Sequence, residues 1–359
     1  MVPEARPLGS QDAGLPIPRG TSRFLLLSLA CIGLFFLDLL LGSVRIPLIE
    51  VPRIFLGTAS DPVWSTIMTL FRLPKAVTAV ATGAALAVAG LILQTLFRNP
   101  LAGPDSLGIG AGASIGAGIV VILAGGAGST FLGELGFAGY SALALASSLG
   151  AAVVLAVILA ISRRVASSVT LLIIGILVGY FAGSILSVLI FFASPQKVQV
   201  FLGWTYGSFA GVTASRLPIL LGAAFLGILI VATMTKDLDA LLLGDRAAAS
   251  IGINTRRART RVLIAASLLA GTVTAFCGPI AFLGIAAPQG ARRLFRTSAH
   301  RQLVPGSALV GIFFALLADV MSQGAPGGVA LPINPLLALL GAPVILSIVL
   351  RSRGREAGS

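Results

Sequence analysis

The stretch 72–118, RLPKAVTAVATGAALAVAGLILQTLFRNPLAGPDSLGIGAGASIGAG, decides the fold of this chain. It holds two long apolar runs, which a polar turn at Asn99 separates. Pro74 stands in the first turn of the first run, where its missing backbone N–H costs nothing. Gly83 and Gly90, among several alanines, give this run a small-residue face that favours close packing of membrane helices. The stretch therefore predicts a hairpin of two tightly packed transmembrane helices.

The composition of the whole chain agrees with a membrane protein. Of its 359 residues, 57% are apolar and 10% are charged, whereas a soluble domain carries roughly 25% charged residues. The net charge of +13 does not indicate a nucleic-acid partner, because the basic residues form short clusters beside apolar runs. Cys31 and Cys277 lie inside apolar runs and match no metal-ligand spacing. We expect neither a metal nor a cofactor.

Ten apolar segments predict an all-α integral membrane protein, since a membrane helix needs about 20 residues. The run 262–291 is too long for one helix, and Pro279 breaks helices. We divide it into a helix that ends near Cys277 and a shorter one that either spans or is re-entrant. The segments are 24–42, 76–97, 107–125, 138–161, 169–193, 217–235, 262–277, 281–294, 303–321 and 335–350.

The distribution of Lys and Arg predicts the orientation. If the N-terminus is cytoplasmic, 19 of the 25 basic residues, including Arg6, lie on the inner side and six, including Arg45, on the outer side. Such a bias is typical of cytoplasmic loops. We expect a multi-pass protein of a bacterial cell (inner) membrane, in contact with lipids and with both termini cytoplasmic. A disordered tail is predicted at 1–23, one permease domain at 24–350 and a second tail at 351–359.

The motifs of 72–118 resemble the FecCD-type permease family of ABC importers, which includes vitamin B12 and ferric-siderophore permeases. The opening R-L-P-K, the core G-A-x-L-A-x-x-G and the turn Q-x4-N-P-L-A occur in the family's order and spacing. The segments 278–293 and 318–343 also resemble it. The resemblance implies a type II ABC importer fold. It implies a second permease, identical or paralogous, two separate ATP-binding subunits, and an extracellular or periplasmic substrate-binding protein.

The segment 244–252 is similar to the family's coupling helix, which docks in a cleft of the ATPase. A short alanine-rich helix ended by Gly252 suits such docking. The resemblance assigns this role to Gly244, Asp245, Arg246, Ala247, Ala248, Ile251 and Gly252. For the four arginines at 256, 257, 259 and 261, an anchor at the inner membrane surface is the favoured interpretation.

Two further groups have a structural and a functional interpretation. Arg72 and Lys75 either anchor a helix end at the outer interface or, by resemblance, grip acidic residues of the binding protein. Ser167 and Ser168 either cap a helix or, by resemblance, lie at the inner gate. The only histidine, His300, is expected at the surface of an inner loop.

Two positions depart from the family pattern. Gln289 stands where many members have His, so no proton-relay role is carried over. Gln323 stands where the vitamin B12 permease has an outer Arg, so the docking surface differs in kind. The favoured ligand is a ferric siderophore, with vitamin B12 or haem as alternatives.

Two other classes of protein compete with an ABC permease. An ion-driven secondary transporter would need ionisable residues at mid-depth, whereas Asp38 and Asp319 lie near outer helix ends, within reach of interfacial water. An intramembrane enzyme would need a catalytic constellation, and we identify none. A Walker A loop needs a Gly-Lys pair, but Lys75, Lys197 and Lys236 follow Pro, Gln and Thr. We therefore predict a transport subunit that is not an enzyme and relies on a separate ATPase.

Overall fold

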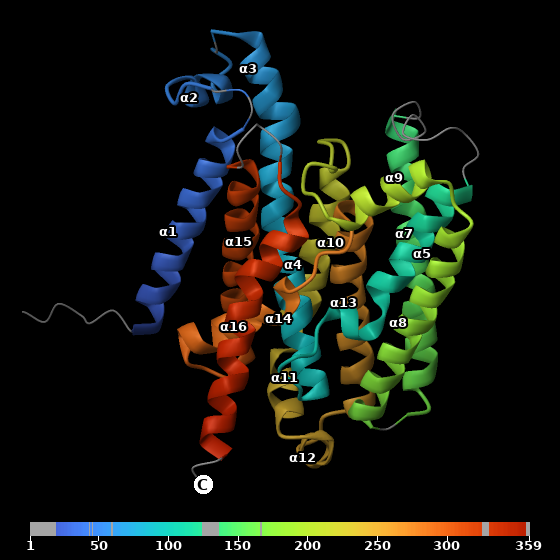
Figure 1. The fold of residues 1–359 in the computed structure, drawn as a ribbon. Helices are drawn as coiled ribbons and strands as arrows, with labels where there is room; N and C mark the ends of the chain where they lie inside the picture. Colours follow the sequence, from blue (N-terminus) through green and yellow to red (C-terminus); the bar gives the residue numbers. More distant parts are fainter. Residues whose placement is uncertain are drawn as a thin grey trace, which may run out of the picture.

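The computed structural model of this chain describes residues 19–42, 44, 46–58, 60–123, 136–165, 167–324 and 330–356. These residues form a bundle of helices (Figure 1), and no strand occurs among them. Residues 1–18, Arg45 and residues 357–359, on which parts of the tail and charge predictions depend, lie outside the described residues.

Within the described residues, ten helices make up the bundle and shorter helices connect them. The ten are α1 (Arg19–Leu40), α4 (Leu73–Phe97), α5 (Ile109–Leu123), α7 (Gly136–Ser162), α8 (Ser168–Phe191), α10 (Leu217–Thr233), α13 (Thr255–Cys277), α14 (Leu283–Phe295), α15 (His300–Gln323) and α16 (Ile333–Glu356). The shorter ones are α2 (Glu50–Phe55), α3 (Pro62–Ile67), the π-helical η1 (Met68–Arg72), the 3-10 helix η2 (Pro104–Leu107), α9 (Pro195–Thr205), α11 (Thr235–Leu242) and α12 (Asp245–Ser250).

The ten predicted segments correspond one to one to these ten helices. Six helical stretches in the described part of the chain are long and apolar enough to cross a membrane on their own, and α10 and α11 form a further pair bent by 61°. α1 begins at Arg19 and α16 continues to Glu356, so both helices extend beyond the predicted 24–350. α14 has 13 residues, about 20 Å of helix, which is shorter than a bilayer core of about 30 Å.

The two ends of the bundle carry different features (Figure 1). The end that carries α2, α3 and α9 is called the α9 end below, and the opposite end, with α11 and α12, the α12 end. α1 and α15 reach the α9 end with their C-termini, and α4 reaches it with its N-terminus. Side chains from these three helices can therefore meet there.

α4 is the centre of the bundle. In the continuous helical stretch Pro62–Phe97, which ends with α4, 83% of the residues in the most apolar 18-residue part are buried, against 11% in the corresponding part of α8. A Cβ atom added at Gly83 would lie 2.5 Å from the carbonyl oxygen of Gly311 on α15. One added at Gly90 would lie 1.6 Å from the carbonyl oxygen of Gly284 on α14. The predicted small-residue face is confirmed, and it lets two helices approach α4 backbone to backbone.

The chain is not helical between α13 and α14, as the sequence predicts from Gly278-Pro279. The side chain of Asn334, at the start of α16, forms hydrogen bonds with the backbone of this break. Its Nδ2 donates to the carbonyl oxygens of Pro279, at 2.6 Å, and Thr205, at 2.9 Å. Its Oδ1 accepts from the N–H of Ala281 at 3.1 Å. Polar backbone groups at membrane depth need such partners, so Asn334 stabilises the break.

Candidate functional site

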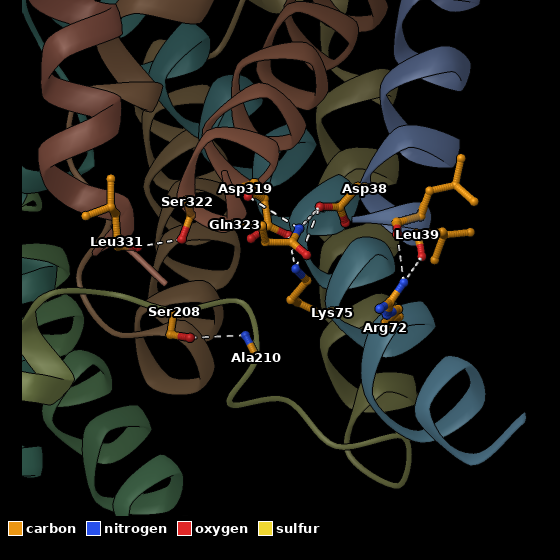
Figure 2. A network of polar contacts seen from close by, with 11 residues as sticks. Asp38, Leu39, Arg72, Lys75, Ser208, Ala210, Asp319, Ser322, Gln323 and Leu331 are labelled. Carbon is orange, nitrogen blue, oxygen red and sulfur yellow. Dashed lines mark hydrogen bonds and ion pairs between the residues drawn. The ribbon is translucent and has the colours of Figure 1, made fainter. Parts of the chain in front are cut away.

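Four polar side chains meet at the α9 end and form what is called the outer cluster (Figure 2): Asp38 of α1, Lys75 of α4, and Asp319 and Gln323 of α15. Lys75 Nζ lies 3.1 Å from Asp319 Oδ2 and 3.7 Å from Asp38 Oδ1. Gln323 Nε2 donates to Asp38 Oδ1 at 2.5 Å. The expectation that both carboxylates reach interfacial water is wrong, since the Asp38 side chain is 0% exposed and that of Asp319 5%.

Arg72 lies beside this cluster but faces the end of α1 (Figure 2). Its Nη1 donates to the carbonyl oxygens of Leu39, at 2.8 Å, and Leu40, at 3.0 Å. Its Nη2 donates to that of Val44. The last carbonyls of a helix have no partner within the helix, so the guanidinium of Arg72 acts as a C-terminal cap for α1.

A cavity of about 250 Å³ opens next to the outer cluster. Its lining includes Lys75, Asp319 and Gln323 of the outer cluster, together with Tyr206 and Ile333. To bind an acidic residue of a partner, the ammonium of Lys75 would have to leave two carboxylates, and Arg72 is itself buried. These contacts support a structural role for both residues, and docking by Arg72 and Lys75 stays a prediction.

At the α12 end, the predicted coupling segment is a short helix with one exposed face. Arg246, Ile251 and Gly252 are exposed, and Asp245 and Ala247 are half-buried. Gly244 and Ala248 are buried, and Ala248 packs with Leu241 and Ala258. The side chain of Ala248 therefore points into the protein, so a partner would contact the other face of α12. Gly244 has φ +104°, a conformation that favours glycine.

The two serines predicted at the inner gate lie close to α12. Ser167 caps α8, because its side chain accepts a hydrogen bond from the N–H of Thr170 at 3.2 Å. Ser168 is buried, and its Oγ accepts from Arg259 Nη2 at 3.4 Å. The same nitrogen lies 3.3 Å from Asp245 Oδ2. Arg259 thus connects two predicted sites, although the sequence favours a membrane anchor for it.

Two further polar contacts hold α4 to its neighbours near the α12 end. The predicted surface position of His300 is wrong: it is 0% exposed, with Nδ1 2.6 Å from Asp239 Oδ1 and Nε2 2.7 Å from Thr95 Oγ1. Gln289 Nε2 donates to Gln94 Oε1 of α4 at 2.8 Å. At the position where the family often has His, this chain therefore uses Gln to join α14 to α4.

The apolar helices of the described residues, with their buried ion pairs, form a bundle typical of an integral membrane protein. The solved structure of an inward-facing, metal-chelate type ABC transporter has the same fold. It matches with a TM-score of 0.80 and 24% sequence identity, over 92% of this chain and 99% of the solved chain.

The chain belongs to the FecCD transport family, which it matches over residues 29–351. It is 31% identical to the hemin transport system permease protein HmuU of Yersinia pestis, over 84% of this chain and 88% of that protein. It is also 31% identical to the iron(3+)-hydroxamate import system permease protein FhuG of Bacillus subtilis (strain 168), over 89% of this chain and 93% of that protein. The chain is therefore a permease subunit of an ABC transporter.

Proposed function

We propose that this chain is the permease of a binding-protein-dependent importer in a bacterial inner membrane, and that it takes up a ferric siderophore. The exposed α12, at the end of the bundle that carries most of the basic residues, is the observation that carries the proposal. The excess of Lys and Arg supports a cytoplasmic position for that end, which is the side where an ATPase would dock. The similarity to FhuG, an iron(3+)-hydroxamate import permease, supports an iron–hydroxamate type of ligand.

The other subunits follow from this assignment. Two ATP-binding subunits hydrolyse ATP, because the sequence offers no P-loop of its own. A second permease, identical or paralogous, completes the pathway with the exposed faces of this one. A substrate-binding protein delivers the ligand at the α9 end, and both termini face the cytoplasm.

Reconstitution in proteoliposomes with the ATPase and the binding protein tests the function. We expect ATP-dependent uptake of ferric hydroxamate, and hemin and cobalamin are run as parallel ligands. Uptake of hemin or cobalamin alone would replace the siderophore by that ligand. Uptake that survives loss of ATP hydrolysis but stops when the proton gradient is collapsed would identify an ion-driven secondary transporter instead.

The docking role of α12 makes a separate prediction at Ile251, which is 62% exposed. Ile251→Trp should weaken association with the ATPase by about tenfold or more, because a bulky side chain prevents a small helix from entering a cleft, and interface cores are sensitive to such changes. Co-purification of the ATPase at several protein concentrations measures this effect.

Ile219 of α10 provides a matched control, since it is the same residue with the same exposed fraction, 62%, far from α12. Ile219→Trp should leave ATPase association unchanged. If both variants bind the ATPase as tightly as the wild type, α12 is not the docking helix. Ala248→Trp is not a suitable variant, because Ala248 is buried and the substitution would disturb folding.

A further inference from the structure

One buried arginine at the α12 end contacts two segments that are far apart in the sequence. Arg259 lies in the first turns of α13 and is 7% exposed. Its Nη1 donates to the carbonyl oxygen of Val165 at 2.8 Å. Its Nη2 donates to Ser168 Oγ at 3.4 Å and to Asp245 Oδ2 at 3.3 Å. The guanidinium therefore touches both α12 and the connection between α7 and α8.

The chemistry of these contacts requires arginine. A guanidinium presents several donors in one rigid plane, so it can hold a carbonyl, a hydroxyl and a carboxylate at the same time. The ammonium of lysine is a point charge on a flexible stem and cannot reproduce this fork. A buried cation is stable only if its acceptors stay in place, so Arg259 couples the positions of its acceptors.

The space beside Arg259 is not filled by side chains. A cavity of about 320 Å³ lies beside it and is lined by Arg163 and Arg164 of the α7–α8 connection, and by Asp245 and Thr255 near α12. The Asp245 side chain is 35% exposed, whereas Arg259 is held on α13, which packs against α4 and α7. Asp245 is therefore the part of the network that a partner docking on α12 reaches first.

We propose that Arg259 is a positioning residue that transmits movement of α12 to the α7–α8 connection and its residues Val165 and Ser168. The inference rests on the proposed docking of an ATPase at α12. When the ATPase displaces α12, Asp245 moves relative to the guanidinium. The guanidinium then shifts its contacts with Val165 and Ser168, which changes the inner end of α8. Ion-pair networks that have two arrangements can carry such coupling between sites.

Arg259→Gln tests the link, with uptake per hydrolysed ATP as the measurement. A hydrogen bond to a charged group changes an equilibrium by roughly tenfold or more, so we expect uptake per ATP to fall by about tenfold. Association with the ATPase should remain, because Arg259 is a buried residue of α13 and is not part of the exposed face of α12. Arg259→Lys should not restore coupling. Arg257→Gln, at an exposed arginine two residues earlier, is the matched control and should couple like the wild type.

Asp245→Asn and Ser168→Ala test separately the contact of Arg259 with α12 and its contact with the start of α8. Each should reduce uptake per ATP less than Arg259→Gln does, and adding Asp245→Asn to Arg259→Gln should cause no further loss. If Arg259→Gln fails to fold, Asp245→Asn decides the question, because the contact with Val165 remains in that variant. Wild-type uptake per ATP in Arg259→Gln, or in Asp245→Asn if only that one folds, would overturn the link. Absence of ATP-driven uptake in the wild type would instead overturn the proposed function.

Discussion

Replacing Gly90 by alanine is expected to abolish assembly of the bundle around α4, and with it any transport. The added Cβ would lie 1.6 Å from the carbonyl oxygen of Gly284 and 2.5 Å from its carbonyl carbon. Both atoms are backbone, so no rotamer change relieves the clash and α14 must move away from α4. Overpacking costs about 1–3 kcal/mol where side chains can adjust, and we expect a larger loss here. Yield of monodisperse protein and its thermal unfolding temperature in detergent measure it.

Gly33→Ala on α1 is the control for this variant. A Cβ atom added at Gly33 meets no heavy atom within 4 Å, and alanine favours a helix over glycine by about 1 kcal/mol. This variant should be at least as stable as the wild type. A Gly90→Ala protein with wild-type yield and unfolding temperature would show that α4 and α14 do not pack as closely as described.

Lys75→Met is expected to be the most destabilising single change in the outer cluster. It removes the ammonium that lies between Asp38 and Asp319 and leaves two buried carboxylates without a cation. Removing one partner of a buried ion pair costs about 3–5 kcal/mol. The unfolding temperature in detergent should therefore fall by several degrees, although the mutated side chain keeps its length.

The triple variant Lys75→Met, Asp38→Asn, Asp319→Asn should recover most of this stability. Replacing a whole buried ionic group by neutral side chains of similar size is often nearly neutral. The pair of variants also separates the two roles of Lys75. If Lys75 serves docking and not packing, Lys75→Met keeps wild-type stability and weakens binding-protein affinity, and the triple variant binds just as weakly.

The helices of this protein could be predicted from sequence because a bilayer leaves few alternatives. Backbone groups in lipid must be satisfied within helices, so long apolar runs are enough to locate them. Pro279 was sufficient to place the break between α13 and α14. The glycines at 83 and 90 predicted a close approach of other helices to α4. They did not predict the partners, Gly311 and Gly284, which lie roughly 200 residues further along the chain.

The polar contacts could not be predicted in the same way. Charge counting treats every arginine of 256–261 alike and does not distinguish the buried Arg259 from the others. A signal was present, because Arg259 precedes the buried Val262 and Leu263 by three and four residues and so shares their helix face. No such signal exists for His300, whose partner Asp239 is 61 residues away. The same holds for Arg72, since the sequence does not reveal that α1 ends beside it.

Asn334 has a consequence for a protein whose interior changes during its cycle. Water normally hydrates any non-helical backbone, and a segment that depends on water changes its bonding when the space around it dries. The backbone at Pro279 and Ala281 does not depend on water for these hydrogen bonds, because the amide side chain of Asn334 supplies both the donor and the acceptor. Its hydrogen bonds can therefore persist whether or not water reaches the break, and α14 can begin at a fixed point while the helices around it move.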